Sequence, residues 1–205
     1  MPAYISSKST IPQVNQSGKL ILKWINRNLN PEQKNAVSRI LTGQARPLPY
    51  IIYGPPGTGK TVTVVEAVLQ IFLLRSDSRI LVVTPSNSAA DLIVERIHFS
   101  KQIQIGDLAR LNAFQRAPEA IPEVVRSYSF TNDELQVLSK VVRHRIVIAT
   151  CTTSGGIYKL GLSEGHFTHC FIDEAGETTE PESMIPIGTI SRHIQLSSER
   201  VKHNL

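Results

Sequence analysis

The stretch Gly54-Pro55-Pro56-Gly57-Thr58-Gly59-Lys60-Thr61 separates two apolar segments, residues 50–53 and residues 61–75. The first is short enough for a strand, and the second is apolar almost all round, as in a largely buried helix. A strand, a glycine-rich loop and a helix in this order predict a P-loop, whose backbone N–H groups converge on a phosphate at the N-terminus of the helix. Lys60 is then expected to reach the β- and γ-phosphates of a nucleotide, and the Thr61 hydroxyl to bind Mg²⁺.

Three further apolar runs, each bounded by small or turn-forming residues, follow at 80–83, 146–149 and 170–172. Continuous rather than alternating apolar residues favour strands that are covered on both faces, as in parallel sheets. Since helical segments alternate with these runs, the pattern predicts a doubly wound α/β domain, with a mostly parallel sheet and helices on both faces. Ligands of such domains bind at the carboxyl ends of the strands.

Two helices are expected beside the one that follows the glycine-rich loop. Residues 30–41 offer an Asn cap, Pro31 at the first helical position and a short apolar stripe. Residues 88–97 form the second, where Ser88 and Asp91 have the spacing of a capping box.

Residues 99–144 fit the alternation less well and are interpreted as an insertion. They contain a possible strand at 108–113, two prolines, and a helical stretch at 132–142.

Two carboxylates follow the last apolar run, at Asp173 and Glu174. A strand that ends in Asp-Glu is ordinary by itself, but here the strand is expected to end at the same sheet edge as the glycine-rich loop. Asp173 is therefore expected to hold Mg²⁺, through water, and Glu174 to act as the general base on an attacking water.

Length and composition exclude several classes of protein. The 205 residues, 41% of them hydrophobic, suit one globular domain, at about 100–200 residues per domain. No apolar stretch is long enough to span a membrane, and the first twenty residues lack the apolar core of a signal peptide. Two cysteines, Cys151 and Cys170, cannot form a disulfide framework, which favours a reducing intracellular compartment.

The positive charge is concentrated near the N-terminus. Residues 1–50 contain seven basic side chains and one acidic, whereas the rest of the chain contains 15 and 16. Residues 1–28, rich in Ser, Lys and Asn, are expected to form a flexible basic arm. The arm could attract a polyanion such as a nucleic acid, or serve only as a solvated linker.

Three motifs in this order resemble superfamily 1 helicases of the nonsense-mediated-decay type, and within them the Mov-ten and Armitage RNA helicases. These are Asn28-Leu29-Asn30-Pro31-Glu32-Gln33, Thr84-Pro85-Ser86-Asn87-Ser88-Ala89-Ala90-Asp91 and Asp173-Glu174-Ala175-Gly176 with Glu180-Pro181-Glu182. The resemblance covers residues 24–191 and implies a RecA-like ATP-binding domain over residues 29–196, followed by a truncated tail at 197–205.

The resemblance also assigns roles to polar residues. Gln33 is implied to read the adenine edge of ATP with its amide donor and acceptor. Thr84, Pro85, Ser86 and Asn87 are implied to grip a nucleic-acid phosphate, and Thr150, Thr152, Thr153 and Ser154 to hold the single strand. The hydroxyls in the last two groups could equally form an ordinary helix cap and a turn. Trp24 could stack on a base, although packing is the commoner role for such a residue.

The implied function is an ATP-dependent RNA helicase domain that couples hydrolysis of MgATP to translocation or unwinding on single-stranded RNA. The family's γ-phosphate sensor motif and its second RecA-like domain are not found in this sequence. The alternative is therefore a truncated module that binds ATP and RNA with little turnover. An AAA-type ATPase, a third possibility, fits poorly with the long interval from Lys60 to Asp173. The resemblance further implies a cytoplasmic protein of RNA granules, with partners in RNA silencing or RNA decay, and no membrane association.

Overall fold

The computed structural model describes residues 22–45, 48–131, 134–163 and 165–188, and the backbone of residues 194–198. Most of the expected basic arm and most of the expected tail lie outside the described residues. Residues 197 and 198 belong to the last strand, so the domain extends slightly beyond the boundary expected at residue 196.

One parallel sheet runs through the described part of the chain, with seven strands in the order β1-β7-β6-β2-β5-β3-β4. In chain order the strands are β1 Tyr50–Tyr53, β2 Ile80–Thr84, β3 Leu108–Asn112, β4 Ser129–Thr131, β5 Ile146–Thr150, β6 His169–Ile172 and β7 Ile194–Ser198. All four apolar runs of the sequence are strands, and the predicted parallel α/β architecture is confirmed.

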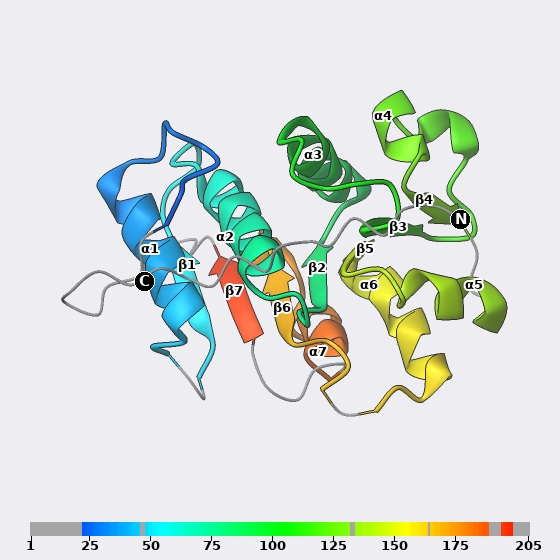
Figure 1. The fold of residues 1–205 in the computed structure, drawn as a ribbon. Coiled ribbons are helices and arrows are strands. Elements are labelled where there is room, and N and C mark those ends of the chain that lie inside the picture. The colour runs from blue at the N-terminus through cyan, green and yellow to red at the C-terminus, as the bar shows by residue number, and fades with distance from the viewer. Residues whose placement is uncertain (1–21, 46–47, 132–133, 164, 189–193, 199–205) are drawn as a thin grey trace.

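Helices cover both faces of the sheet (Figure 1). They are α1 Pro31–Thr42, α2 Lys60–Leu74, α3 Asn87–Phe99, α4 Glu123–Arg126, α5 Leu135–Val141, α6 Cys151–Ser154 and α7 Glu180–Gly188, with single 3₁₀ turns at Pro118–Ala120, Gly155–Leu160 and Ala175–Glu177. Buried residues of α1 to α4 form one cluster with the sheet, and buried residues of α5, α6 and the Gly155–Leu160 turn form a second cluster on the opposite face.

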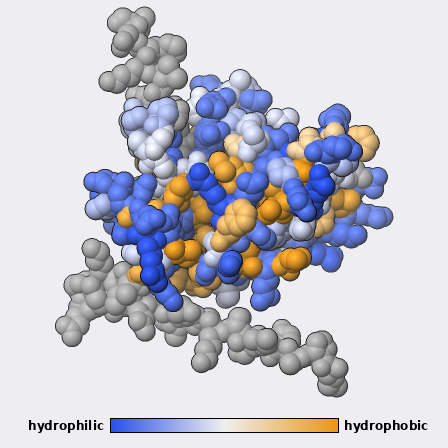
Figure 2. All heavy atoms as spheres, turned by 90° about the horizontal axis from the view of Figure 1, so that it is seen from above, coloured by the Kyte–Doolittle hydropathy of each residue, from blue (hydrophilic) through white to orange (hydrophobic). Residues whose placement is uncertain are grey.

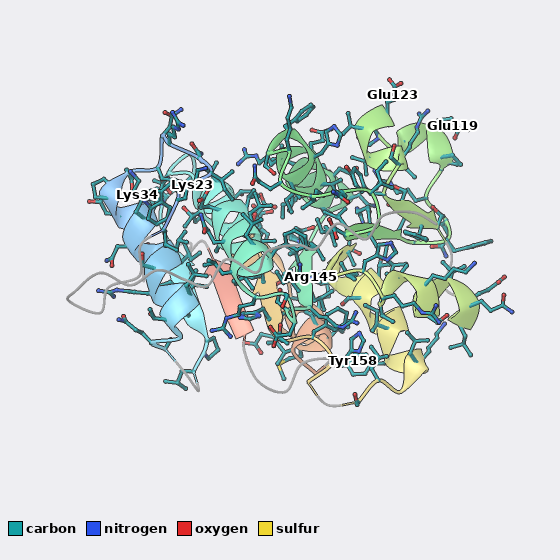
Figure 3. The ribbon with its side chains drawn as sticks, viewed as in Figure 1. Lys23, Lys34, Glu119, Glu123, Arg145 and Tyr158 are labelled. Carbon is teal, nitrogen blue, oxygen red and sulfur yellow. The ribbon has the colours of Figure 1, made fainter. Side chains whose placement is uncertain are left out.

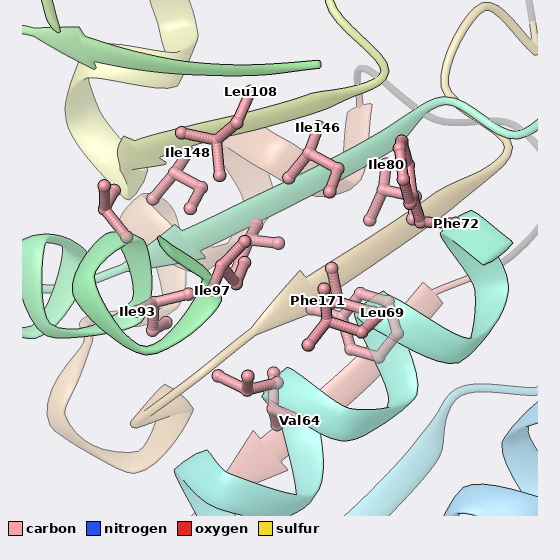
Figure 4. Close-up of a cluster of buried hydrophobic side chains, with 14 of the residues drawn as sticks. Val64, Leu69, Phe72, Ile80, Ile93, Ile97, Leu108, Ile146, Ile148 and Phe171 are labelled. Carbon is pink, nitrogen blue, oxygen red and sulfur yellow. The ribbon is translucent and has the colours of Figure 1, made fainter. Parts of the chain in front are cut away.

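The larger cluster lies between the sheet and helices α2 and α3 (Figure 4). Leu69 of α2 lies beside Phe171 of β6 (Figure 4), and Ile93 of α3 and Ile80 of β2 belong to the same cluster; each of these four side chains is at most 1% exposed. Successive residues of β2 point alternately into the two clusters, since Ile80 and Val82 belong to the first and their neighbours to the second. This explains why the strand is apolar throughout, because both of its faces are covered.

Strand β1 departs from this expectation. Ile51 and Tyr53 are 58% and 61% exposed, whereas Tyr50 and Ile52 pack against the cluster of α1 and α2. Within the described residues β1 pairs only with β7 and forms an edge of the sheet. The prediction of a strand covered on both faces is therefore wrong for β1, although its boundaries are as expected.

The segment interpreted as an insertion is part of the sheet. Strand β3 lies between β5 and β4, and both pairings are parallel. Residues 99–144 thus extend the sheet by two strands rather than forming a separate addition, and the predicted strand and helix correspond to β3 and α5.

Helix α3 begins earlier than expected. Its N-cap is Ser86, whose Oγ accepts a hydrogen bond from the backbone N–H of Ala89. The capping box predicted for Ser88 and Asp91 is wrong, because Asp91 is buried one turn further along and pairs with arginines instead.

The last seven residues of the expected flexible arm are packed against α2. The carboxylate of Glu66 accepts hydrogen bonds from the backbone N–H groups of Ile25 and Asn26, at 3.0 and 2.9 Å, and the Gln70 amide donates to the Lys23 carbonyl. Trp24 packs against the larger cluster, with the Lys34 ammonium 5.9 Å from its ring centroid. The arm boundary at residue 28 was therefore placed too far along the chain, and Trp24 is a packing residue.

From above, the surface shows apolar groups near the centre of the face, interrupted by hydrophilic groups and flanked by them on both sides (Figure 2). No helix in the described part of the chain combines the length and hydrophobicity needed to cross a bilayer.

Candidate nucleotide-binding and nucleic-acid site

The carboxyl ends of β1, β6, β2 and β5 bring the predicted site residues to one edge of the sheet. Thr84 at the end of β2 is directly paired with Thr150 at the end of β5, and Val83 is paired with Ile172 of β6. Asp173, the next residue, donates its backbone N–H to the Val83 carbonyl at 2.9 Å. Strand β7 separates β6 from β1, so about two strand spacings, or about 10 Å, lie between Asp173 and the end of β1.

The glycine-rich loop connects β1 to α2 and turns tightly over the helix N-terminus. Gly57 and Gly59 have φ angles of 80° and 82°, which residues with a Cβ rarely adopt. The Lys60 ammonium donates to the carbonyls of Gly54 and Pro55, at 2.8 and 3.0 Å. The loop is thus folded on itself around the lysine that is predicted to bind phosphate.

Gln33 joins helix α1 to this loop. Its Nε2 donates to the Thr58 carbonyl at 3.0 Å, and its Oε1 accepts from the backbone N–H of Asn30 as part of a capping box. A Cβ built on Gly59 would lie 2.6 Å from the same Nε2. The residue implied to read adenine therefore contacts the P-loop directly, a contact that a lone glutamine in the sequence does not indicate.

An open pocket of about 560 Å³ lies beside these residues. Its walls come from the start of α1, from β1, and from the loop with the start of α2, through Asn30, Glu32, Gln33, Ala36, Tyr50–Tyr53, Gly54, Pro55, Thr58, Lys60 and Thr63. The volume is within the range of about 300–1,000 Å³ that is usual for small-molecule sites, so a nucleotide fits. Its position against the P-loop and Gln33 suits a base at α1 and phosphates at Lys60.

Asp173 is 1% exposed, and its Oδ1 has no hydrogen-bond partner among the described residues. A buried carboxylate oxygen without a partner is costly unless a cation or water reaches it. No group of three or more His, Cys, Asp or Glu side chains within the described ranges is arranged to hold a metal ion by itself. This suits Mg²⁺, which commonly binds through one or two protein oxygens together with nucleotide phosphates. The Thr61 hydroxyl and the Asp173 carboxylate fit that donor set.

Glu174 adopts a left-handed backbone conformation, with φ 56° and ψ 35°. For a residue with a Cβ this conformation costs about 1–2 kcal/mol, and such strain is concentrated at functional sites. The turn redirects the chain immediately after β6.

The residues predicted to grip nucleic acid fall into two groups. Thr84 and Ser154 are fully buried, and their hydroxyls donate to the carbonyls of Ser86 and Cys151. Thr150 accepts from the backbone N–H of Thr153, which caps the short helix α6. These side chains shape the turns and are not available to a ligand in this arrangement.

The other residues of the two motifs lie at the surface or close to it. Asn87 and Thr152 are exposed, whereas Pro85, Ser86 and Thr153 are half-buried. Both turns begin where β2 and β5 end, and these strands are neighbours. The structure therefore brings the two motifs together at one edge.

Burial also determines the chemistry of the two cysteines. Desolvation raises the pKa of Cys151 to about 11, and it raises the pKa of the fully buried Cys170 well above its usual range. Both thiols are free and protonated at neutral pH, as small buried side chains.

A parallel α/β sheet with a glycine-rich loop after β1 and an acidic pair after β6 defines the class of RecA-like P-loop nucleotide-binding domains. Residues 28–140 match the model of a family described as an AAA domain, and the chain belongs to this family.

Relatives that are similar to this chain in sequence are named RNA helicases. RNA helicase Mov10l1 of Homo sapiens is 51% identical over 170 residues, which are 83% of this chain and 14% of that protein. Probable RNA helicase armi of Drosophila melanogaster is 42% identical over 191 residues, with 83% of this chain and 16% of that protein covered. The resemblance to Mov-ten and Armitage helicases is confirmed. The chain spans less than one fifth of the length of either relative.

Solved structures share the fold at low identity. A nuclease-deletion mutant of the Type ISP restriction-modification enzyme LlaGI, in complex with a DNA substrate mimic, has a TM-score of 0.61 at 13% identity, covering 87% of this chain and 18% of that one. A DEAD box protein from Methanococcus jannaschii has a TM-score of 0.57 at 14% identity, covering 86% and 49%. These similarities confirm the RecA-like fold.

Proposed function

We propose that this chain is the ATP-binding motor domain of an RNA helicase, which couples hydrolysis of MgATP to translocation or unwinding on single-stranded RNA. The observation that carries the proposal is the P-loop pocket on the same sheet edge as the buried, unpartnered Asp173 oxygen. Relatives named RNA helicases support RNA as the second ligand.

The nucleotide occupies the pocket between α1 and the P-loop. Lys60 exchanges the carbonyls of Gly54 and Pro55 for phosphate oxygens, which are stronger acceptors because they are charged. Gln33 binds the adenine edge with its amide, which has a second donor hydrogen and a second acceptor lone pair besides those used within the protein.

Hydrolysis requires groups at the end of β6. Thr61 and Asp173 would hold Mg²⁺, which when bound neutralises charge on the phosphates. Glu174 accepts a proton from the attacking water as general base. It follows Asp173 directly at the end of β6 and is only partly buried, which supports this role.

RNA lies across the same edge, over the turns that follow β2 and β5. Asn87 and Thr152 are the exposed side chains of these turns and supply hydrogen bonds to the strand. Lys23 and Lys34 lie near α1 and contribute positive charge there, whereas Glu123 lies on α4 and Glu119 in the Pro118–Ala120 turn before it (Figure 3).

The shape of the pocket favours a second candidate function, in which this chain alone is an ATP- and RNA-binding module. It is open along β1, which is an edge strand with Ile51 and Tyr53 exposed. An arginine finger can be worth about 10³–10⁵ in the rate of nucleotide hydrolysis, and the family resemblance implies that a second domain supplies such arginines. The chain alone would then bind ATP and RNA with little turnover. A cytoplasmic role in RNA silencing or RNA decay remains a proposal that rests on the family resemblance.

RNA-stimulated ATP hydrolysis tests the proposal, measured on the parent chain, Lys60→Ala, Glu174→Gln and the exposed control Glu177→Gln. A motor domain loses nucleotide binding in Lys60→Ala, and Glu174→Gln binds ATP but loses at least about 10²-fold in turnover. Glu177→Gln keeps the parent activity. If the parent binds a fluorescent ATP analogue but turns over negligibly, the binding module is supported, and a parent that binds no nucleotide contradicts both functions.

A further inference from the structure

A group of polar side chains, three of them buried, lies apart from the nucleotide site and connects the start of α3 to β3 and the loop after it. It consists of Asn87 and Asp91 of α3, Arg110 and Asn112 of β3, and Arg116. Arg110 is 0% exposed, which is unusual for an arginine within a sheet strand. We refer to these five residues as the α3–β3 cluster.

Arg110 makes three different contacts with its guanidinium. Nε donates to Asp91 Oδ1 at 3.0 Å, Nη2 donates to Asn87 Oδ1 at 2.8 Å, and Nη1 donates to the Leu111 carbonyl. Because the guanidinium is planar and rigid, these three contacts set the orientation of the whole group.

Arg116 holds the same carboxylate from the other side. It donates to both oxygens of Asp91, to Asn112 Oδ1 at 2.7 Å and to the Ala120 carbonyl at 2.9 Å. It has no hydrogen bond to Asn87 in the described structure. Both arginines therefore bond to Asp91, but only Arg110 bonds to Asn87.

The contact with Arg110 determines which way the Asn87 amide faces. A guanidinium has only donors, so the atom of Asn87 that meets it must be the carbonyl oxygen. The amide NH₂ of Asn87 is then left to face away from the cluster, on an exposed residue in the first turn of α3.

We propose that Arg110 is a positioning residue for nucleic-acid binding, which fixes the Asn87 amide so that its NH₂ group donates to the bound strand. The inference rests on the proposed function, because it needs RNA at this edge. An outward donor matches a phosphate oxygen, which can only accept hydrogen bonds. Arg110 itself touches no ligand.

The experiment compares Arg110→Lys with Arg116→Lys in the full chain. Both variants keep a positive charge and lose the guanidinium bonds to Asp91, but only Arg110→Lys releases Asn87. Affinity for a fluorescent oligouridine is measured beside affinity for a fluorescent ATP analogue and the melting temperature. We expect Arg110→Lys to weaken RNA binding about tenfold more than Arg116→Lys does, with equal ATP affinity.

Asn87→Asp provides a second variant that keeps the fold. It retains an acceptor for Arg110, as an ion pair, but replaces the outward donor by a charged acceptor. We expect a melting temperature at or above that of the parent, and RNA affinity at least about tenfold lower.

Either of two results would contradict this inference and leave the proposed function unaffected. They are equal loss of RNA affinity in Arg110→Lys and Arg116→Lys, and parent-like RNA binding by Asn87→Asp. If the parent chain binds no RNA, the proposed function falls together with the inference.

Discussion

At the scale of single residues, Gly59 is constrained both by its own backbone and by a neighbour. Its φ of 82° disfavours any side chain, and a Cβ would meet the Gln33 amide at 2.6 Å. Gly106 has a φ of 107° with nothing within 4 Å of a built Cβ, so it shares the backbone requirement without the neighbour.

This difference predicts that Gly59→Ala weakens nucleotide binding far more than Gly106→Ala does. The alanine methyl pushes the Gln33 amide away from the loop and strains the backbone at residue 59, which we expect to lower affinity for a fluorescent ATP analogue at least about tenfold. Gly106→Ala should retain parent affinity, with a modest loss of melting temperature from backbone strain. Equal affinities of the two variants would contradict the contact between Gln33 and the loop.

The cysteines give a prediction about reactivity and pH. The pKa of Cys151 rises from 9.0 to about 11, so at pH 8 its thiolate fraction in the folded chain is about 100-fold below that in the unfolded chain. Iodoacetamide labelling of the native protein should accordingly be slow, and fast in guanidinium chloride. Because the pKa of this thiol is higher in the folded chain than in the unfolded chain, its contribution to the free energy of unfolding is fully present below pH 9. This contribution is lost as the pH rises towards 11. Equal labelling rates in both states would show that the thiol is accessible.

At the scale of elements, the contact between residues 22–28 and α2 depends on one buried carboxylate. Glu66 is 2% exposed and accepts two backbone N–H groups and the Gln70 amide. Each N–H group that faces this carboxylate needs an acceptor. A glutamine at position 66 would turn its own NH₂ donor towards one of these N–H donors.

We therefore expect Glu66→Gln to release this segment and to lower the free energy of unfolding by about 1–3 kcal/mol. Hydrogen exchange at the amides of Ile25 and Asn26 should accelerate more than that of the β2 amides, which open only through global unfolding and should accelerate only by the loss of unfolding free energy. Glu119→Gln, on an exposed side chain, serves as the control and should change neither quantity. Retained protection of both amides in Glu66→Gln would contradict the contact.

At the scale of the whole molecule, two deletions separate charge from folding. Removal of residues 1–21 takes away two basic side chains, Lys8 and Lys19. Removal of residues 1–28 takes away two more and also leaves Glu66 without its backbone partners. The shorter deletion is thus the appropriate test of an RNA-binding arm.

If the arm contacts RNA, deletion of residues 1–21 should reduce the slope of log affinity against log salt concentration by about 1.4, at about 0.7 for each phosphate released from a single strand. The melting temperature should stay unchanged. Deletion of residues 1–28 should in addition lower the melting temperature by several degrees, at roughly 2–4 °C per kcal/mol for a domain of this size. An unchanged slope with the shorter deletion would exclude the arm from RNA binding.

Local sequence predicted the parts of this protein that depend on neighbours in the chain. The strands β2, β5 and β6 are buried on both faces and are therefore apolar without interruption. The P-loop and the acidic pair after β6 could be recognised for a similar reason, since loop geometry and strand order are encoded locally. Asn30 as the cap of α1 belongs with them.

Other features depend on partners that are distant in sequence. Asp91 has the spacing of a capping residue, but it is paired with Arg110 and Arg116, 19 and 25 residues away. The one indication of this pairing in the sequence is Arg110, an arginine within an otherwise apolar strand pattern. Glu66 bonds to residues about 40 positions earlier, which no periodicity reveals.

By itself, the sequence determined the class of the fold, the position of the glycine-rich loop and the acidic pair at the end of β6, because each follows from hydrophobic pattern and backbone requirements over a few residues. Tertiary structure alone decided that residues 99–144 complete the sheet, that residues 22–28 belong to the domain, and that Arg110 orients Asn87. The physical reason is that buried donors and charges require partners, and the tertiary fold determines which residues, often distant in the sequence, lie close enough to be those partners.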